Sequence, residues 1–132
     1  MENMFVESKS KYNFDETVEK LNEAIAEGGW RVLHTHNLQE TMIKNGYDDV
    51  LQTKVIELCN PKLAHQLLSD NESRIYSNMM PCRMSVYELK DGATYVSRMN
   101  TKMLSMQIGG KVEQVMGGAF QQAEEFINKV SK

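Results

Sequence analysis

The sequence has few of the residues that mark disulfide scaffolds or nucleic-acid binders. Its 132 residues include two cysteines and two prolines, and two cysteines do not make a disulfide scaffold. The 15 Lys and Arg residues are slightly outnumbered by 18 Asp and Glu residues. The formal net charge of -3 therefore provides no basic surface for nucleic acid or anionic lipid.

Long apolar runs are also missing. No stretch approaches the roughly 18 apolar residues of a membrane span, and no apolar segment of a signal peptide follows the N-terminus. We therefore expect a cytoplasmic protein with no nucleic-acid or membrane partner.

The composition is that of a globular protein, with 41% hydrophobic and 25% charged residues. No linker, low-complexity tract or internal repeat divides the chain. We expect one domain over residues 1–132.

The spacing of apolar residues predicts nine elements in the order β-α-β-α-β-α-β-β-α. The expected fold is a compact α+β domain in which helices pack on a mixed β-sheet of about five strands. The expected strands are 4–8, 30–36, 50–59, 82–89 and 94–99, and the clearest helix spans 112–130.

Three asparagines mark the starts of the earlier helices. Asn13 and Asn37 are each followed three residues later by glutamate, the spacing of a capping box. Asn60 precedes Pro61, which suits the first helical position because no N–H is needed there.

Two adjacent glycines, Gly117 and Gly118, lie inside the last predicted helix. Each costs about 1 kcal/mol relative to alanine. We interpret them as a point of close backbone contact with the sheet or with a partner.

Four motifs along the chain form a recognisable set: Gly29-Trp30-Arg31-Val32, Glu57-Leu58-Cys59-Asn60-Pro61, Met80-Pro81-Cys82-Arg83-Met84-Ser85-Val86-Tyr87-Glu88 and Asp91-Gly92. With these motifs the sequence resembles the family known as domain of unknown function 302, from about residue 4 to about residue 131. The resemblance implies a compact α+β fold, a homodimer, and no established activity.

The two cysteine motifs are the most specific part of this resemblance, and they suggest a shared thiol site at Cys59 and Cys82. Cys59 precedes a predicted helix start, where the helix dipole would favour a thiolate. The favoured alternative is that Cys59 packs as a small apolar residue, in a hydrophobic staple with Ala64. The two thiols meet if their strands are antiparallel neighbours and lie apart if the strands are parallel. His65 is the nearest candidate base.

Ten methionines are an unusually large number for this length. Thioethers and thiolates together select soft metals such as Cu(I), but methionine also fills irregular cores. His34 and His36 share one face of a predicted strand. No spacing matches a zinc motif, so we assign no metal and no cofactor.

The hairpin at Asp91-Gly92 suggests an anion site. With a two-residue turn, Arg83 and Arg98 become diagonal neighbours on one face of the sheet. Two adjacent guanidinium groups require an anionic ligand or an acidic side chain nearby. The candidate ligand-binding residues are Arg83, Arg98, Ser85 and Tyr87.

These observations favour a homodimeric binding or accessory domain with a small-anion site. One alternative is a thiol-dependent redox protein or enzyme that uses Cys59 and Cys82. A second is a soft-metal or haem-binding protein. No enzymatic reaction is assigned, because no motif places a pair of carboxylates or a nucleophile elbow.

Overall fold

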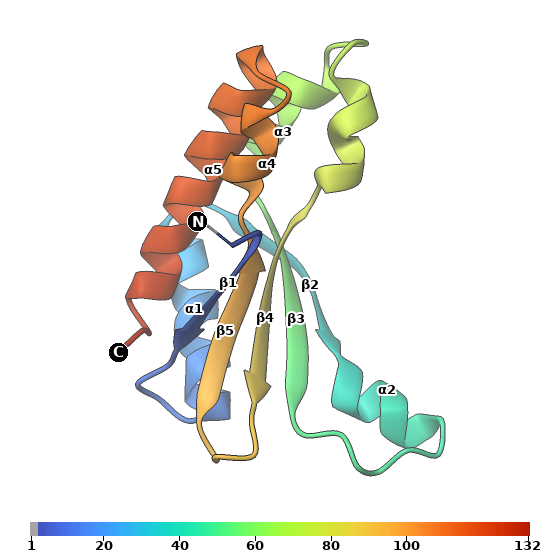
Figure 1. The fold of residues 1–132 in the computed structure, drawn as a ribbon, viewed down its shortest axis with the longest axis vertical. Coiled ribbons are helices and arrows are strands. Elements are labelled where there is room, and N and C mark those ends of the chain that lie inside the picture. The colour runs from blue at the N-terminus through green and yellow to red at the C-terminus, as the bar shows by residue number, and fades with distance from the viewer. Residues whose placement is uncertain (1–2) are drawn as a thin grey trace.

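Five strands form one sheet in the order β1-β5-β4-β3-β2 in the computed structural model, which describes residues 3–132 (Figure 1). The strands are β1 (Phe5–Lys9), β2 (Arg31–Asn37), β3 (Thr53–Cys59), β4 (Cys82–Glu88) and β5 (Thr94–Met99). The helices are α1 (Phe14–Glu27), α2 (Leu38–Lys44), α3 (Pro61–Leu68), α4 (Thr101–Met106) and α5 (Gly110–Asn128), with a 3-10 helix η1 (Arg74–Met79).

The α+β class and the five strands are confirmed, but the sheet is antiparallel rather than mixed. Every strand pair among the described residues is antiparallel. A helical crossover often joins parallel strands. Here the connection from β3 to β4 contains α3 and η1, and both lie beyond one end of the sheet (Figure 1). The chain therefore re-enters the sheet at the end it left, in the opposite direction.

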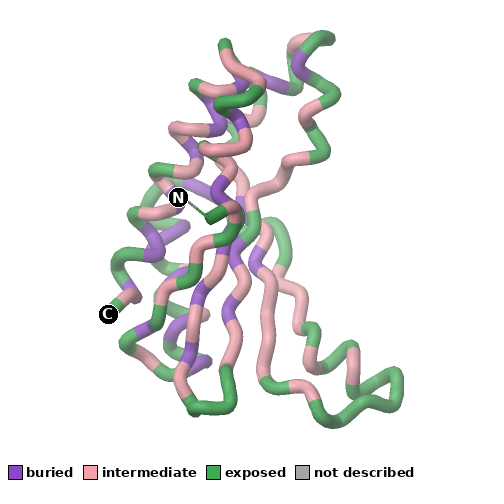
Figure 2. The backbone as a smooth tube through the Cα atoms, viewed as in Figure 1, coloured by how far each residue is buried: buried purple, intermediate pink, exposed green. Residues whose placement is uncertain are grey.

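Helices α1 and α5 cover one face of the sheet and bury the main core against it (Figure 1). Leu21 and Ile25 of α1 and Ile127 of α5 have no exposed surface, because they pack with apolar residues such as Ile56 and Val86 of the strands. The residues of the other face are mostly half-buried or exposed (Figure 2). A helix layer therefore covers only one side of the sheet.

The three asparagine caps form as the sequence predicts. The backbone N–H groups of Glu16, Glu40 and Leu63 donate to the side-chain oxygens of Asn13, Asn37 and Asn60 at 2.9, 2.9 and 3.2 Å. A fourth cap was not expected: Met103 N–H donates to Asn100 Oδ1 at 3.0 Å and starts the unpredicted α4. The polar segment between α3 and β4 contains η1.

The β4–β5 hairpin has a different register from the one expected. Leu89 N–H donates to Ala93 O at 3.1 Å, and the strands pair Val86 with Val96 and Glu88 with Thr94. A three-residue loop, with Gly92 at φ +83°, therefore replaces the expected two-residue turn. This shift of one residue moves side chains between faces.

The expectation that Arg83 and Arg98 share a face is therefore wrong. The observed register places Arg98 on the helix-covered side with Met84, where Arg98 is only 8% exposed. Arg83 lies on the uncovered side with Ser85 and Glu57.

The glycine pair of α5 does not mark a close backbone contact within the described chain. A Cβ added at Gly118 would meet nothing within 4 Å, and one at Gly117 would meet only Lys102 Cγ at 3.7 Å. Both glycines instead line a hollow beside α4. Within residues 3–132, no helix has the length and apolar character needed to cross a membrane.

Candidate functional site

A cleft opens where β4 and β5 separate. Their ladder ends at the Ser85–Ser97 pair. Beyond it, β4 stays paired with β3 as far as Cys82, and β5 stays paired with β1 as far as Met99. The two strands are thus held by different neighbours, and the sheet splits between them.

The cleft has a volume of about 470 Å³, which lies within the range of small-molecule sites. Most of its wall is apolar, and a few polar side chains converge on it. The apolar residues are Phe5, Val55, Leu58, Met79, Pro81, Cys82, Met84, Met99, Leu104, Phe120 and Ala123; the polar residues are Asn78, Arg83, Ser85, Ser97, Arg98 and Thr101.

Main-chain groups also face this split. Glu88 N–H donates to Gln52 O at 3.0 Å, so the even-numbered residues of β4 direct their main-chain groups toward β3. Asn100 N–H donates to Met4 O at 2.6 Å, so the even-numbered residues of β5 face β1. By the same alternation, the N–H and C=O of Arg83 and Met99 point toward each other across the opening, beyond the last pair of the ladder.

Arg98 forms part of the cleft wall, but most of its N–H groups are bonded to other parts of the chain. Its Nε and Nη2 donate to the two carboxylate oxygens of Glu124 at 2.6 and 2.7 Å. Its Nη1 donates to Ser8 Oγ at 2.8 Å. Nη1 also donates to Val96 O at 3.4 Å, so four of the five N–H groups have partners and Glu124 neutralises the charge.

Arg83 is the cation available to a ligand. Within residues 3–132 its one ion pair is with Glu57, at 3.6 Å from Nε to Oε2, and its side chain is 56% exposed. Glu57 is shared, because His36 Nε2 lies 2.8 Å from its other oxygen. The hydrogen bond from His36, followed by the charges of His36 and Arg83, lowers the pKa of Glu57 below its ordinary value. Glu57 therefore stays charged without Arg83.

The structure brings Ser85 to the cleft but leaves Tyr87 outside it. Tyr87 lies farther along β4, stacks on Tyr95 with ring centroids 6.3 Å apart, and donates a hydrogen bond to Glu7. Burial, and then this hydrogen bond, raise the pKa of Tyr87 to about 12. It stays protonated and holds β4 to β1 across the hairpin.

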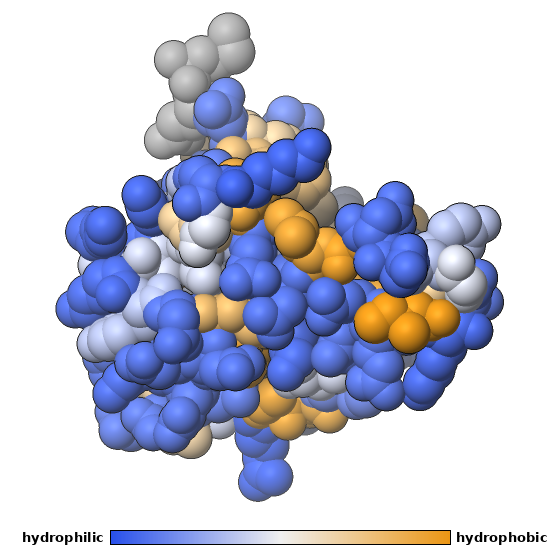
Figure 3. Space-filling model, turned by 90° about the horizontal axis from the view of Figure 1, so that it is seen from below, coloured by the Kyte–Doolittle hydropathy of each residue, from blue (hydrophilic) through white to orange (hydrophobic). Residues whose placement is uncertain are grey.

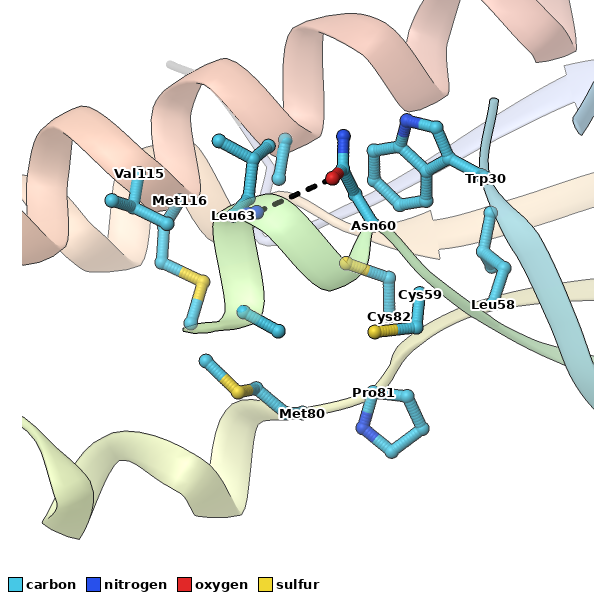
Figure 4. A pocket seen from close by; sticks show the side chains of 12 residues that line it. Trp30, Leu58, Cys59, Asn60, Leu63, Met80, Pro81, Cys82, Val115 and Met116 are labelled. Carbon is cyan, nitrogen blue, oxygen red and sulfur yellow. Dashed lines mark hydrogen bonds between the residues drawn. The ribbon is translucent and has the colours of Figure 1, made fainter. Parts of the chain in front are cut away.

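The two cysteines line one small pocket, of about 30 Å³, behind the cleft (Figure 4). Cys82 pairs with Leu58 on the adjacent antiparallel strand, so Cys59 is the next residue beyond that pair. Both cysteines are free. Met80 and Met116 line the same pocket, and Trp30 closes one side of it.

Neither thiol has the environment of a reactive nucleophile. Burial raises the pKa of Cys59. Burial, and then the neighbouring Cys59, raise the pKa of Cys82 to about 11. Both are therefore protonated near neutral pH. His65 lies exposed on α3 and is not among the residues lining the pocket, so the structure does not bring it to the thiols.

The histidine pair lies on the uncovered face of the sheet. The rings of His34 and His36 are 4.3 Å apart, centroid to centroid, in an edge-on arrangement. Across residues 3–132, no group of three or more His, Cys, Asp or Glu side chains is placed to hold a metal ion.

The sequence matches the family described as "Domain of unknown function DUF302" over residues 6–130. The chain belongs to this family. The crystal structure of an uncharacterized conserved DUF302 protein from Bacillus stearothermophilus superposes with a TM-score of 0.87 at 21% identity, covering 98% of this chain and 99% of that one. At this identity the likeness concerns the fold alone. No curated protein matches the chain.

Several site residues of this DUF302 domain were not predicted from its sequence. Phe5, Leu104 and Phe120 reach the cleft from three elements that meet only in the folded chain. Met116 reaches the thiol pocket from α5, more than 30 positions from Cys82 along the printed sequence. Met80 was the one residue with a local signal, because it precedes Pro81-Cys82 in the family motif.

Proposed function

We propose that this DUF302 domain binds a small amphipathic anion in the cleft between β4 and β5. The observation that carries the proposal is the split in the sheet, which opens a largely apolar cavity of about 470 Å³ with an incompletely engaged guanidinium beside it. An apolar cleft with a few convergent polar groups is the usual form of a small-molecule site.

Each part of the ligand has a matching part of the wall. The apolar portion would pack against side chains such as Met84 and Phe120. The anionic group would accept hydrogen bonds from Arg83, from the Ser85 and Ser97 hydroxyls, and from main-chain N–H groups in the split. Arg98 holds the wall through Glu124 and takes no direct part in the anion site.

Paired fluorescent probes test this function. We expect 8-anilinonaphthalene-1-sulfonate to bind the protein with increased fluorescence. Arg83→Met should weaken that binding about fivefold, since a charged contact made by an exposed side chain contributes up to about 1 kcal/mol. N-phenyl-1-naphthylamine has the same apolar body without the sulfonate, so its affinity should not change in the variant.

Arg31→Met is the matched control, because Arg31 is exposed on β2 and does not line the cleft. Ala123→Leu, which fills the cleft from α5, should weaken both probes. The proposal fails if neither probe binds, or if Arg83→Met and Arg31→Met have equal effects on the sulfonate.

The thiol-dependent alternative has less support, because burial raises the pKa of both thiols and no base lies beside them. A reducing, cytoplasmic location is part of our proposal, in keeping with two unbridged cysteines on neighbouring strands.

We also propose that the domain acts as a homodimer. The support is a projecting arm, which consists of α2 and the chain on either side of it and lies apart from the helix layer (Figure 1). Its large apolar side chains are exposed: Leu38, Ile43, Tyr47 and Leu51. Seen from the end where α2 lies, the surface carries apolar patches within a hydrophilic surround (Figure 3). Sedimentation at micromolar concentration tests the proposal.

A further inference from the structure

Four sulfur-bearing side chains line the pocket behind the cleft. Cys59 ends β3, Cys82 begins β4, Met80 lies two residues before Cys82, and Met116 projects from the middle of α5. In Figure 4 the two thiols lie on one side of the pocket and the two thioethers lie on the other. Side-chain sulfur atoms from three separate parts of the chain therefore line one small pocket.

The pocket has the size and the chemistry of a site for a single ion. Its volume of about 30 Å³ exceeds the roughly 10–15 Å³ that a cavity needs to hold one water molecule, so it can take one small ion. Its wall is otherwise almost wholly apolar and includes Leu63 and Trp30. A water molecule needs two to four polar partners, and this wall offers very few.

We propose that Cys59, Cys82, Met80 and Met116 form a binding site for one Cu(I) ion. Thiolate and thioether sulfur are the ligands that select Cu(I), whereas Zn²⁺ takes thiolate, imidazole and carboxylate. Among the described residues, no group of three or more His, Cys, Asp or Glu side chains is placed to hold a harder ion. The thioethers thus set the metal preference.

The charge balance is compatible with the apolar surroundings. One Cu(I) ion that displaces a proton from each thiol gives a bis-thiolate complex of net charge -1 and releases two protons. Cys59 immediately precedes Asn60, the N-cap of α3, so the positive end of that helix dipole lies beside the complex. Methionine side chains are flexible enough to close on the ion.

The fluorescence of the single tryptophan can report metal binding in this pocket. Trp30 is the only tryptophan, is 4% exposed, and lines the sulfur pocket. A metal ion bound among the four sulfurs would quench its fluorescence, whereas metal bound at the surface would not.

The test is an anaerobic titration of the reduced protein with Cu(I) in competition with a coloured Cu(I) chelator. We expect one equivalent to be retained and Trp30 fluorescence to fall in parallel. The double variant Met80→Leu, Met116→Leu keeps the packing volume and should bind Cu(I) about tenfold or more weakly. Cys59→Ser and Cys82→Ser should each remove the quenching.

Met106→Leu is the matched control, because Met106 is 57% exposed on α4 and does not line the pocket; this variant should bind as the wild type does. Zn²⁺ at the same concentration should leave Trp30 unchanged. The proposal is overturned if the wild type retains no Cu(I), if copper binds without quenching, or if the double methionine variant binds as tightly as the Met106 control. None of these outcomes depends on the probes used for the cleft.

Discussion

Arg98 of β5 and Glu124 of α5 form a two-point ion pair at the helix-covered side of the sheet. Nε and Nη2 of the guanidinium meet the two carboxylate oxygens at 2.6 and 2.7 Å. The Arg98 side chain is 7% exposed and that of Glu124 is 25% exposed. The pair therefore fixes the position of the last helix on the strand that forms one wall of the cleft.

Removing one partner of this pair should be costly. Glu124→Ala leaves a buried guanidinium without its carboxylate, so the free energy of unfolding should fall by about 3 kcal/mol. The combined variant Arg98→Met, Glu124→Leu replaces both charges by apolar groups and should lose less than Glu124→Ala alone. Urea unfolding of the single and double variants measures the coupling.

The result would differ if the pair contributed nothing to stability. Each single variant would then unfold near the wild-type midpoint, and the double variant would show only the sum of two small effects. Lys129→Ala is a suitable comparison, because the Lys129–Glu27 pair lies at 3.7 Å on the surface, where such pairs contribute little.

The parts of the fold that depend on neighbouring residues could be predicted from the sequence. The caps at Asn13, Asn37 and Asn60 each require only residues within three positions. The register of the β4–β5 hairpin could not, because Asp91-Gly92 fits either a two-residue or a three-residue loop. The difference of one residue decides whether Arg98 shares a face with Arg83 or lies on the helix-covered face.

The candidate site was less predictable than the fold. The cleft exists because, beyond the Ser85–Ser97 pair, β4 stays paired only with β3 and β5 only with β1. This arrangement depends on the pairing of the whole sheet. The sulfur pocket joins β3, β4 and α5, whose approach no local pattern encodes. The sequence did indicate Cys59, Cys82 and the neighbouring Met80, but nothing in it joined Met116 to the thiols.

Alkaline pH should destabilise the protein through Cys82. The pKa of this thiol is about 11 in the folded chain, against an ordinary value of 9.0, because burial and then the neighbouring Cys59 disfavour the thiolate. The native state holds the proton more tightly, so the stability from Cys82 is complete below pH 9 and is lost as the pH rises towards 11. We expect the free energy of unfolding to fall by about 2 kcal/mol over this interval.

Cys82→Ala provides the control for this pH dependence. The variant should be less stable at neutral pH, but its stability should decline less steeply with rising pH. Any remaining slope would come from other groups, among them Tyr87, whose pKa is about 12. Parallel curves for the wild type and the variant would contradict the assignment to Cys82.

Alanine substitutions at Gly118 of α5 and at Gly28, which lies against α5, should change stability in opposite directions. Gly118→Ala meets no atom within 4 Å, so it should stabilise the protein by about 1 kcal/mol through helix propensity alone. Gly28→Ala would place its Cβ 2.4 Å from Cε1 of Phe126, so the aromatic ring must move and stability should fall. Thermal unfolding measures both, and a stabilising Gly28→Ala would show that Phe126 repacks freely.

Dimer formation through the projecting arm gives a prediction about mass. Ile43 and Tyr47, which are 55% and 61% exposed, are the most exposed large apolar residues of the arm. If the arms pack against a second copy, the wild type should sediment at about twice 15.1 kDa at micromolar concentration. Ile43→Asp combined with Tyr47→Ser should return the mass towards one chain.

Ile75→Asp is the control variant, because it removes an exposed apolar side chain that lies outside the arm. Ile75 is 75% exposed, on η1 at the opposite end of the molecule from α2 (Figure 1), so its substitution should leave the mass unchanged. A wild type that sediments at 15.1 kDa would contradict the dimer itself. A dimer that survives the arm variant but dissociates with Ile75→Asp would place the interface beside η1, near the opening of the sheet, where a second copy could also affect access to the cleft.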